Sequence, residues 1–390
     1  MNSPPMPHDQ QPFAAQPGPA GRPRLESVDL LRGSVMLLMA LDHTRDFFSN
    51  SPFNPLDLTR TFPALFLTRW ITHFCAPVFV FLAGAGAFLA TTRGKSIREL
   101  SRFLLTRGLW LVWLELTWVN WFGWQFHFNL HYYGIQVIWA IGWSMVALAG
   151  LVWLPGRAIL AFGVTMIVLH NALDGLKPES FGAWTGLWRV LHSPGTVEIA
   201  PGIKLGVGYP LIPWIGVMAA GYAFGPWLLR DAAVKRKCLL VLGASLTALF
   251  VVVRSTNLYG DPRPWMPQQS ALFTAFSFLN CEKYPPSLCY LLMTLGPALL
   301  LLALFDRGTP ALLKPILVFG RVPLFFYLLH LPLLHGLALL ARRLNPTQDA
   351  GFGLAGVYGV WILVVAFLYP VCSAFAEFKR RRPDAWLSYL

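Results

Sequence analysis

Long apolar runs alternate with short polar connections over almost the whole chain. A membrane-spanning helix needs about 20 mostly apolar residues, because the hydrocarbon core is about 30 Å thick and each helical residue adds about 1.5 Å. Ten runs come close to this length. The predicted spans are 28–48, 71–91, 103–122, 135–154, 157–173, 207–229, 238–254, 288–305, 317–341 and 354–376. The pattern therefore predicts an all-α polytopic membrane protein with about ten transmembrane helices.

The connections between the runs are too short or too apolar to build a soluble domain. We therefore expect residues 25–390 to form one multi-helix membrane domain. Residues 1–24 are rich in Pro, Gln and Ala and have no apolar core, which predicts a disordered cytoplasmic tail. The first apolar run has no small-residue cleavage pattern, so we expect it to remain as an uncleaved signal anchor.

Composition agrees with this class and excludes an ordinary soluble protein. Hydrophobic residues make up 55% of the chain and charged residues only 13%. The net charge of +13 could suggest nucleic acid, but the basic residues lie in short clusters beside apolar runs rather than in one continuous patch. We expect membrane lipids as partners and no nucleic acid.

The distribution of Lys and Arg predicts the orientation, because these residues resist translocation across the membrane. Of the 31 Lys and Arg residues, 18 fall on one side of the predicted spans and 11 on the other. Both termini are therefore expected to be cytoplasmic. The longer segments 49–70, 174–206 and 255–287 are expected outside.

Cysteine usage gives little support to metal or thiol-redox chemistry. The five cysteines show no CxxC and no zinc-like Cys/His spacing, so we expect no bound metal. Whether Cys281 and Cys289 form a disulfide stays open at this stage.

The first predicted helix carries the most informative residues. Asp29, Arg32, His43 and Asp46 all lie in this span, and ionisable residues at membrane depth usually face a bundle interior or a cavity. Arg32 and His43 are 11 residues apart, close to three helical turns, so they share a face and are about 16 Å apart. The alternative is that Asp29 and Arg32 form an interfacial ion pair and that the acidic residues around His43 end the helix at the headgroups.

Two further candidates are expected on the outer side of the membrane, where the end of the first span that carries His43 is also expected. His73 begins the second span, where a catalytic role and simple packing are both open. Asp261 lies in the turn-rich segment NLYGDPRPW, where it could contact a substrate hydroxyl or amine or could cap a turn.

The ninth span contains the remaining candidates. Arg321 and His330 lie within VFGRVPLFFYLLHLP, and His330 falls near the middle of the membrane. Pro323 and Pro332 are expected to break or bend this helix, which is tolerated at membrane depth where the backbone lines protein or a cavity.

The order of several motifs resembles one family. The opening RLESVDLLRGSVMLLMALDHTRDFF resembles the heparan-alpha-glucosaminide N-acetyltransferase catalytic-domain family in its bacterial branch, within the transmembrane acyltransferase superfamily. The resemblance continues downstream through HFCAPVFVFLAGAGAFL, PLIPWIGVMAAGYAFG, NLYGDPRPW, KYPPSLCYLLMTLGPALL and FGRVPLFFYLLHLPLLH. It implies an integral protein of the bacterial inner membrane.

The resemblance also implies an activity. Such proteins move an acyl group, here expected to be acetyl, from cytosolic acetyl-CoA or another acyl-CoA to an outward-facing acceptor such as a carbohydrate. The Arg32 and His43 spacing matches an arginine, ten residues, then histidine in the first helix of related membrane acyltransferases.

Specific roles follow for the candidate residues. His43 is the expected general base, and Asp46 is expected to orient its imidazole. Arg32 and Arg321 are expected to contact the acyl-CoA, and the acceptor side is expected to use His73, Asp261 and His330. A homo-oligomer is possible. The rival hypotheses are a proton-coupled transporter, which would use the same polar stripe as a path, and a non-catalytic scaffold.

Overall fold

The computed structural model describes residues 24–92, 94–344, 351–382 and 385–389. The tail predicted over residues 1–24 therefore lies outside the described residues except for Arg24. All ten predicted spans contain helix. The helices that coincide with them are α1 (Glu26–Phe48), α3 (Cys75–Thr91), α4 (Ile97–Leu114), α5 (Val137–Leu151), α6 (Gly156–Leu169), α8 (Leu211–Phe224), α9 (Ala232–Thr256), α11 (Leu288–Phe305), α12 (Ile316–Arg321), α13 (Pro323–Leu344) and α14 (Leu354–Arg381).

Shorter elements connect these helices. The helical ones are α2 (Pro63–Ile71), η1 (Thr72–Phe74), η2 (Glu115–Gln125), η3 (His170–Leu173), η4 (Pro178–Trp184), α7 (Thr185–Leu191), η5 (Gly225–Leu229), α10 (Ala271–Leu279), η6 (Ala311–Leu313) and η7 (Ala385–Tyr389). The strands are β1 (Tyr132–Ile135), β2 (Gly195–Ala200) and β3 (Ile203–Val207).

The predicted class, an all-α polytopic membrane protein, is confirmed. Seven helical segments within the described residues are long and apolar enough to cross a membrane. The other three predicted spans are helical but fall short of that standard, since α1 and α4 carry more charges and α5 has only 15 residues. The chain is thus a multi-pass integral membrane protein.

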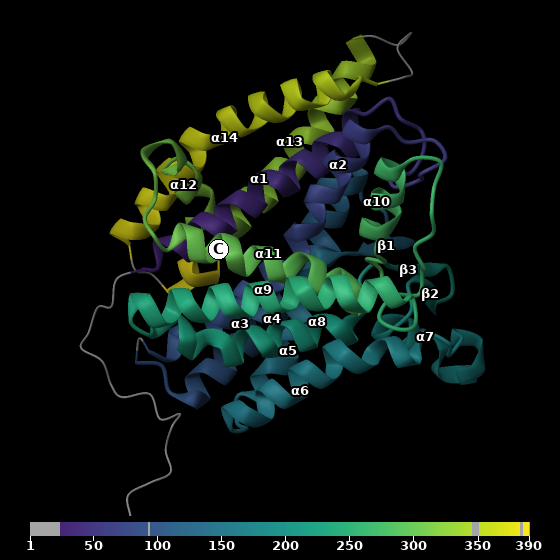
Figure 1. Cartoon of the computed structure of the whole chain (residues 1–390). Helices are drawn as coiled ribbons and strands as arrows, with labels where there is room; N and C mark the ends of the chain where they lie inside the picture. Colours follow the sequence, from purple (N-terminus) through teal and green to yellow (C-terminus); the bar gives the residue numbers. More distant parts are fainter. Residues whose placement is uncertain (1–23, 93, 345–350, 383–384, 390) are drawn as a thin grey trace, which may run out of the picture.

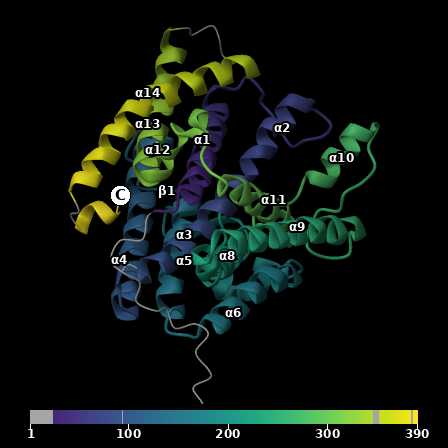
Figure 2. The same ribbon diagram turned by 60° about the vertical axis from the view of Figure 1, so that its left-hand side comes forward.

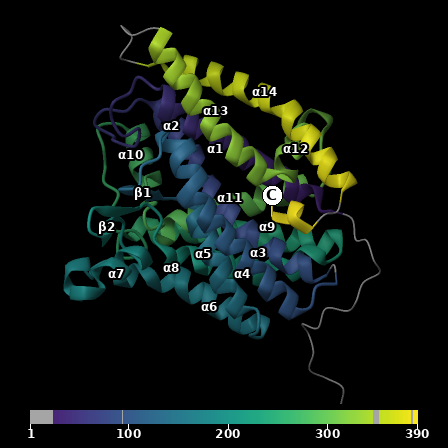
Figure 3. The same cartoon turned by 180° about the vertical axis from the view of Figure 1, so that it is seen from behind.

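Helix α1 lies at the centre of the arrangement. It packs against α12, α13 and α14 on one side and against α3 and α11 on the other. Figure 1 shows α14 and α13 above α1, and α3, α8, α5 and α6 below it. Figures 2 and 3 show the same order of layers from two other directions. The helix that carries the candidate residues is therefore enclosed by protein rather than lipid.

A three-stranded sheet, which the sequence pattern did not predict, covers one end of the molecule. Its strand order is β1-β3-β2, with β1 parallel and β2 antiparallel to β3. Two predicted spans are therefore wrong at their starts, because Ile135 and Val207 pair with each other in this sheet. Pro210 is the N-cap of α8 and separates this helix from β3. We call this end of the molecule the sheet end (Figure 1).

The predicted breaks at two prolines differ in outcome. Val322 leaves helical geometry, and α13 begins anew at Pro323, so the first break is confirmed. Pro332 instead lies inside α13, which continues through it. The break at Pro323 divides the predicted span 317–341 into α12 and α13.

Two glycines allow α1 and α12 to approach closely. A Cβ atom on Gly320 would lie 1.8 Å from the Asp29 carbonyl oxygen, and one on Gly33 would lie 2.2 Å from that of Ile316. Close approach through small residues is a common basis of helix packing in membranes. The contact fixes the beginning of α1 against α12.

We expect Gly320→Ala to destabilise the protein by about 3 kcal/mol, because the added methyl group meets backbone that cannot move aside. The measurement is the thermal unfolding midpoint in detergent. Gly359→Ala in α14, where a Cβ meets nothing within 4 Å, is the matched control. Equal midpoints for the two variants would contradict the packing argument.

Candidate active site

A cavity of about 510 Å³ lies between α1, α3, α4, α5 and α13. Cationic side chains line one part of it, at the end of the molecule opposite the sheet. They are Arg24, Arg32, Lys95, Arg107, Arg321 and Lys379. Among the described residues, Asp29 is the one carboxylate that lines the cavity. We call the part of the cavity formed by these six cations its basic end.

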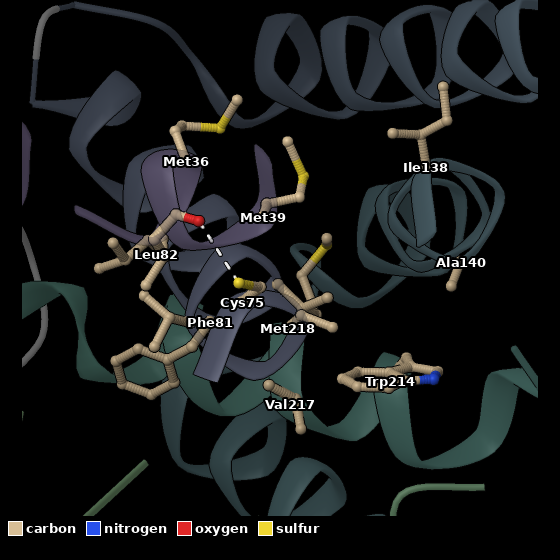
Figure 4. Close-up of a cluster of buried hydrophobic side chains, with 14 of the residues drawn as sticks. Met36, Met39, Cys75, Phe81, Leu82, Ile138, Ala140, Trp214, Val217 and Met218 are labelled. Carbon is tan, nitrogen blue, oxygen red and sulfur yellow. Dashed lines mark hydrogen bonds between the residues drawn. The ribbon is translucent and has the colours of Figure 1, made fainter. Parts of the chain in front are cut away.

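The rest of the cavity is apolar. Met36 and Met39 of α1 lie beside Leu82 of α3, with Ile138 of α5 across from them (Figure 4). The lining extends along α1 as far as Met39, one helical turn before His43. On α13 it extends to Tyr327, whose ring centroid is 6.4 Å from that of His43. The cavity therefore leads from the basic end towards His43.

His43 forms a hydrogen-bonded pair with His330. The His43 Nδ1 atom is 2.7 Å from the His330 Nε2 atom, and the rings are stacked with centroids 5.0 Å apart. The His330 Nδ1 atom lies 3.0 Å from the carbonyl oxygen of Phe326, which can only accept. When both rings are neutral, His330 therefore carries its proton on Nδ1, and His43 donates from Nδ1. The His43 Nε2 atom is left with a free lone pair, as a general base requires.

The predicted face of α1 is supported by these contacts. Arg32 donates to the carbonyl oxygen of Gly320 in α12, and His43 contacts His330 in α13, so both side chains point towards the α12–α13 segment. Asp29 pairs with both Arg24 at 2.5 Å and Arg32 at 3.3 Å. The Asp29–Arg32 ion pair, which the sequence offered as the alternative to a functional role, is thus present. Both of its residues line the cavity.

Asp46 does not occupy the orienting position expected for it. Its carboxylate accepts from Arg45 at 2.6 Å, and 39% of its side chain is exposed. Asp42 bridges Arg45 at 2.9 Å and Arg69 at 2.5 Å, so the acidic residues near His43 belong to an ionic cluster at the helix end. His330, rather than Asp46, bonds to the His43 imidazole.

His73 is completely buried beside this cluster. Neither of its ring nitrogens has a hydrogen-bond partner among the described residues, and its ring centroid lies 5.3 Å from that of Tyr290. The hydroxyl group of Tyr290 donates to the His73 carbonyl oxygen. These contacts of His73 are those of packing.

Asp261 holds two loops together instead of facing the cavity. Its carboxylate accepts from Ser287 Oγ at 2.6 Å and from the backbone N–H groups of Arg263 and Glu282. It also pairs with Arg254 at 3.4 Å, and both side chains are only 2% exposed. The turn-capping alternative therefore describes its contacts.

We expect Asp261→Ala to lower the free energy of unfolding by about 3–5 kcal/mol, because Arg254 would remain buried without its carboxylate. Thermal unfolding in detergent measures the loss. At a temperature where the variant stays folded, its turnover should match that of the wild type. A stable variant with lost turnover would instead assign Asp261 to the reaction.

All five cysteines are free, so Cys281 and Cys289 form no disulfide. Within the described ranges, no group of three or more His, Cys, Asp or Glu side chains gathers in a way that could hold a metal ion.

Comparison with known families decides which family the chain belongs to. The model described as "Heparan-alpha-glucosaminide N-acetyltransferase, catalytic" matches residues 24–257, more than half of the chain. The chain belongs to this family. None of the curated proteins compared with it matches. Membership in the heparan-alpha-glucosaminide N-acetyltransferase family implies a membrane acyltransferase type of function.

The match to the N-acetyltransferase family covers the part of the chain from α1 to α9. It includes Arg32, His43 and His73, whereas Asp261, Arg321 and His330 lie beyond it. The His43–His330 pair thus joins a residue of the matched region to one outside it. The cavity is likewise lined by residues from both the matched region and the region after it, since Arg321 and Lys379 follow residue 257.

Several residues of the site in this N-acetyltransferase family member were not predicted from the sequence. Lys95, Arg107 and Lys379 were used only to orient the helices, although their basic character also indicates an anion site. Trp124 was not among the predicted site residues, but its ring centroid lies 5.3 Å from that of His43 in an edge-to-face contact. Trp124 belongs to η2, a π-helix, and such helices often occur at functional sites.

Proposed function

We propose that this protein transfers an acyl group, most simply acetyl, from acyl-CoA to a hydroxyl or amine of an acceptor. The observation that carries the proposal is the single cavity leading from six cations to within one helical turn of His43. A basic end, an apolar middle and a histidine pair are the parts that a coenzyme A thioester and its deprotonated acceptor require.

The basic end fits the donor's charges. Coenzyme A carries a pyrophosphate and a 3′-phosphate, and arginine side chains bind phosphate oxygens through paired N–H groups. Six cations against one carboxylate leave a strong excess of positive charge to receive them. The pantetheine arm would then lie along Met36 and Met39, with the thioester near Tyr327. The excess of Lys and Arg on this side supports a cytosolic position for the basic end.

The histidine pair supplies the proton transfer. His43 Nε2 accepts the proton of the acceptor's hydroxyl or amine as the oxygen or nitrogen attacks the thioester carbonyl carbon. The carbon–sulfur bond breaks, the new ester or amide bond forms, and the thiolate of coenzyme A takes up a proton to leave as the thiol. His330 keeps the His43 ring in the tautomer that leaves Nε2 unprotonated.

The acceptor would approach His43 from the sheet end, where the aromatic side chains gather. Trp124 stacks on Phe47, and its indole N–H has no partner among the described residues. An unpaired indole N–H beside aromatic rings suits a sugar, which presents both hydroxyls and apolar C–H groups. We therefore propose a carbohydrate acceptor.

The test uses the purified protein in liposomes with acetyl-CoA and a panel of amino sugars and neutral sugars. The expected result is release of free coenzyme A thiol that depends on both substrates, together with an acetylated sugar. Sugar uptake into the liposomes without any acetyl-CoA requirement would instead support the transporter hypothesis. Absence of both thiol release and acetyl-CoA-dependent thermal stabilisation would overturn the proposal.

A further inference from the structure

A second cavity, of about 570 Å³, lies on the outer surface between α9 and α11. Figures 1 and 2 show these two helices side by side. The residues lining it are Ala233, Arg236, Lys237, Leu240 and Val241 of α9, and Leu300, Ala303, Leu304 and Arg307 at or just beyond the end of α11. On each helix the spacing is three or four residues, so a continuous face of each forms one wall. We call this cavity the α9–α11 groove.

The floor of the α9–α11 groove is apolar and open to the surroundings. Val241 is 58% exposed, Leu304 54% and Leu240 44%. Helix α9 is among the segments long and apolar enough to cross a membrane, and only 22% of its most apolar window is buried in the protein. Because this helix faces the hydrocarbon region, acyl chains are the surroundings that the floor would meet.

Cations gather at one end of the groove. Arg236, Lys237 and Arg307 line it, and no ion pair joins them to a carboxylate anywhere in the described ranges. Asp306, which precedes Arg307 in the chain, is already paired with Lys235 at 2.7 Å. Asp231 precedes α9 and makes no side-chain capping bond. Counting both acids and Lys235, this end still has two more cations than carboxylates.

The α9–α11 groove has cations at one end and an apolar floor beyond them, in the same order as the headgroup and acyl chains of a phospholipid. From Ala233 to Val241 the groove follows α9 for about 12 Å, which accommodates a headgroup and the upper part of two acyl chains. Basic grooves between membrane helices are typical sites for anionic lipid headgroups. We propose that the α9–α11 groove binds one anionic diacyl phospholipid, with its phosphate at Arg236, Lys237 and Arg307. This site is separate from the cavity assigned to acyl-CoA and does not depend on the proposed function.

The test is native mass spectrometry of the delipidated full-length protein with added lipid. Phosphatidylglycerol is compared with phosphatidylethanolamine that has the same acyl chains. We expect one tightly bound phosphatidylglycerol, and we expect Arg236→Gln/Arg307→Gln to weaken its binding about 30-fold, from roughly 1 kcal/mol for each lost cation. Phosphatidylethanolamine binding should hardly change.

Two further variants separate the site from general effects of charge. Arg98→Gln/Arg102→Gln removes the same charge from exposed positions of α4 outside the groove, and this variant should bind phosphatidylglycerol like the wild type. Val241→Trp fills the floor without altering charge and should also weaken binding. The proposal is overturned if the groove variants bind phosphatidylglycerol like the wild type, or if a second protein copy occupies the groove, seen as a dimer that Val241→Trp dissociates.

Discussion

His43→Gln is expected to slow acyl transfer by about 10²- to 10⁴-fold, the usual contribution of a general base. The amide of glutamine cannot accept the acceptor's proton, while a side chain of similar size keeps the packing against Trp124 and Tyr327. Turnover with saturating acetyl-CoA measures the loss. Thermal stabilisation by acetyl-CoA should be unchanged, because the residues that line the donor cavity are intact.

The partner residue separates a positioning role from a structural one. His330→Leu removes the acceptor of the His43 Nδ1 proton, and we expect turnover to fall about tenfold to 100-fold. His330→Gln offers an amide oxygen in the same region and should recover part of the loss. If the two His330 variants turned over equally, His330 would have no role in positioning the His43 ring. If His43→Gln retained wild-type turnover while folded, His43 would not be the base.

Arg32→Gln/Arg321→Gln is expected to raise the KM for acetyl-CoA about 150-fold or more with a smaller effect on kcat. Each lost charge-assisted hydrogen bond to phosphate is worth about 1.5–3 kcal/mol, and a uniform loss of binding appears in KM. Both side chains line the basic end, and Asp29 keeps its second partner, Arg24. Initial-rate kinetics over a range of acetyl-CoA concentrations measure the change.

A donor without the 3′-phosphate sharpens this test. If the basic end binds that phosphate, 3′-dephospho-acetyl-CoA should bind the wild type less tightly, and the double variant should lose less with it than with acetyl-CoA. Arg98→Gln/Arg102→Gln serves again as the charge-matched control outside the cavity. A KM that does not change in Arg32→Gln/Arg321→Gln would remove these residues from the donor site.

The helices were predictable because the membrane imposes one length on every span. The predicted span 288–305 coincides with α11, and the first span differs from α1 by two residues. The sheet was not predictable, since β1 and β3 are short and their pairing joins residues about 70 positions apart. The π-helical geometry of η2 was missed as well, because a shift in backbone hydrogen bonding leaves no mark in composition.

The site was only partly predictable for a similar reason. The spacing of Arg32 and His43 follows from helical geometry, so their common face could be derived from α1 alone. His330 lies 287 positions after His43, and only the packing of α13 against α1 brings the two rings together. Turn-forming residues surround Asp261 in the sequence, which is typical of a residue that caps a turn. The sequence could not show whether its carboxylate accepts hydrogen bonds from the protein or is available to a substrate.

The six cations of the basic end come from separate parts of the chain, among them α1, α4, α12 and α14. Like charges held together repel one another, and one carboxylate, Asp29, offsets only part of that repulsion. This repulsion therefore destabilises the packing of these helices against one another whenever no anion lies between the cations. A bound polyphosphate would act as a counterion shared by four helices, so the donor would also hold together the walls of its own site.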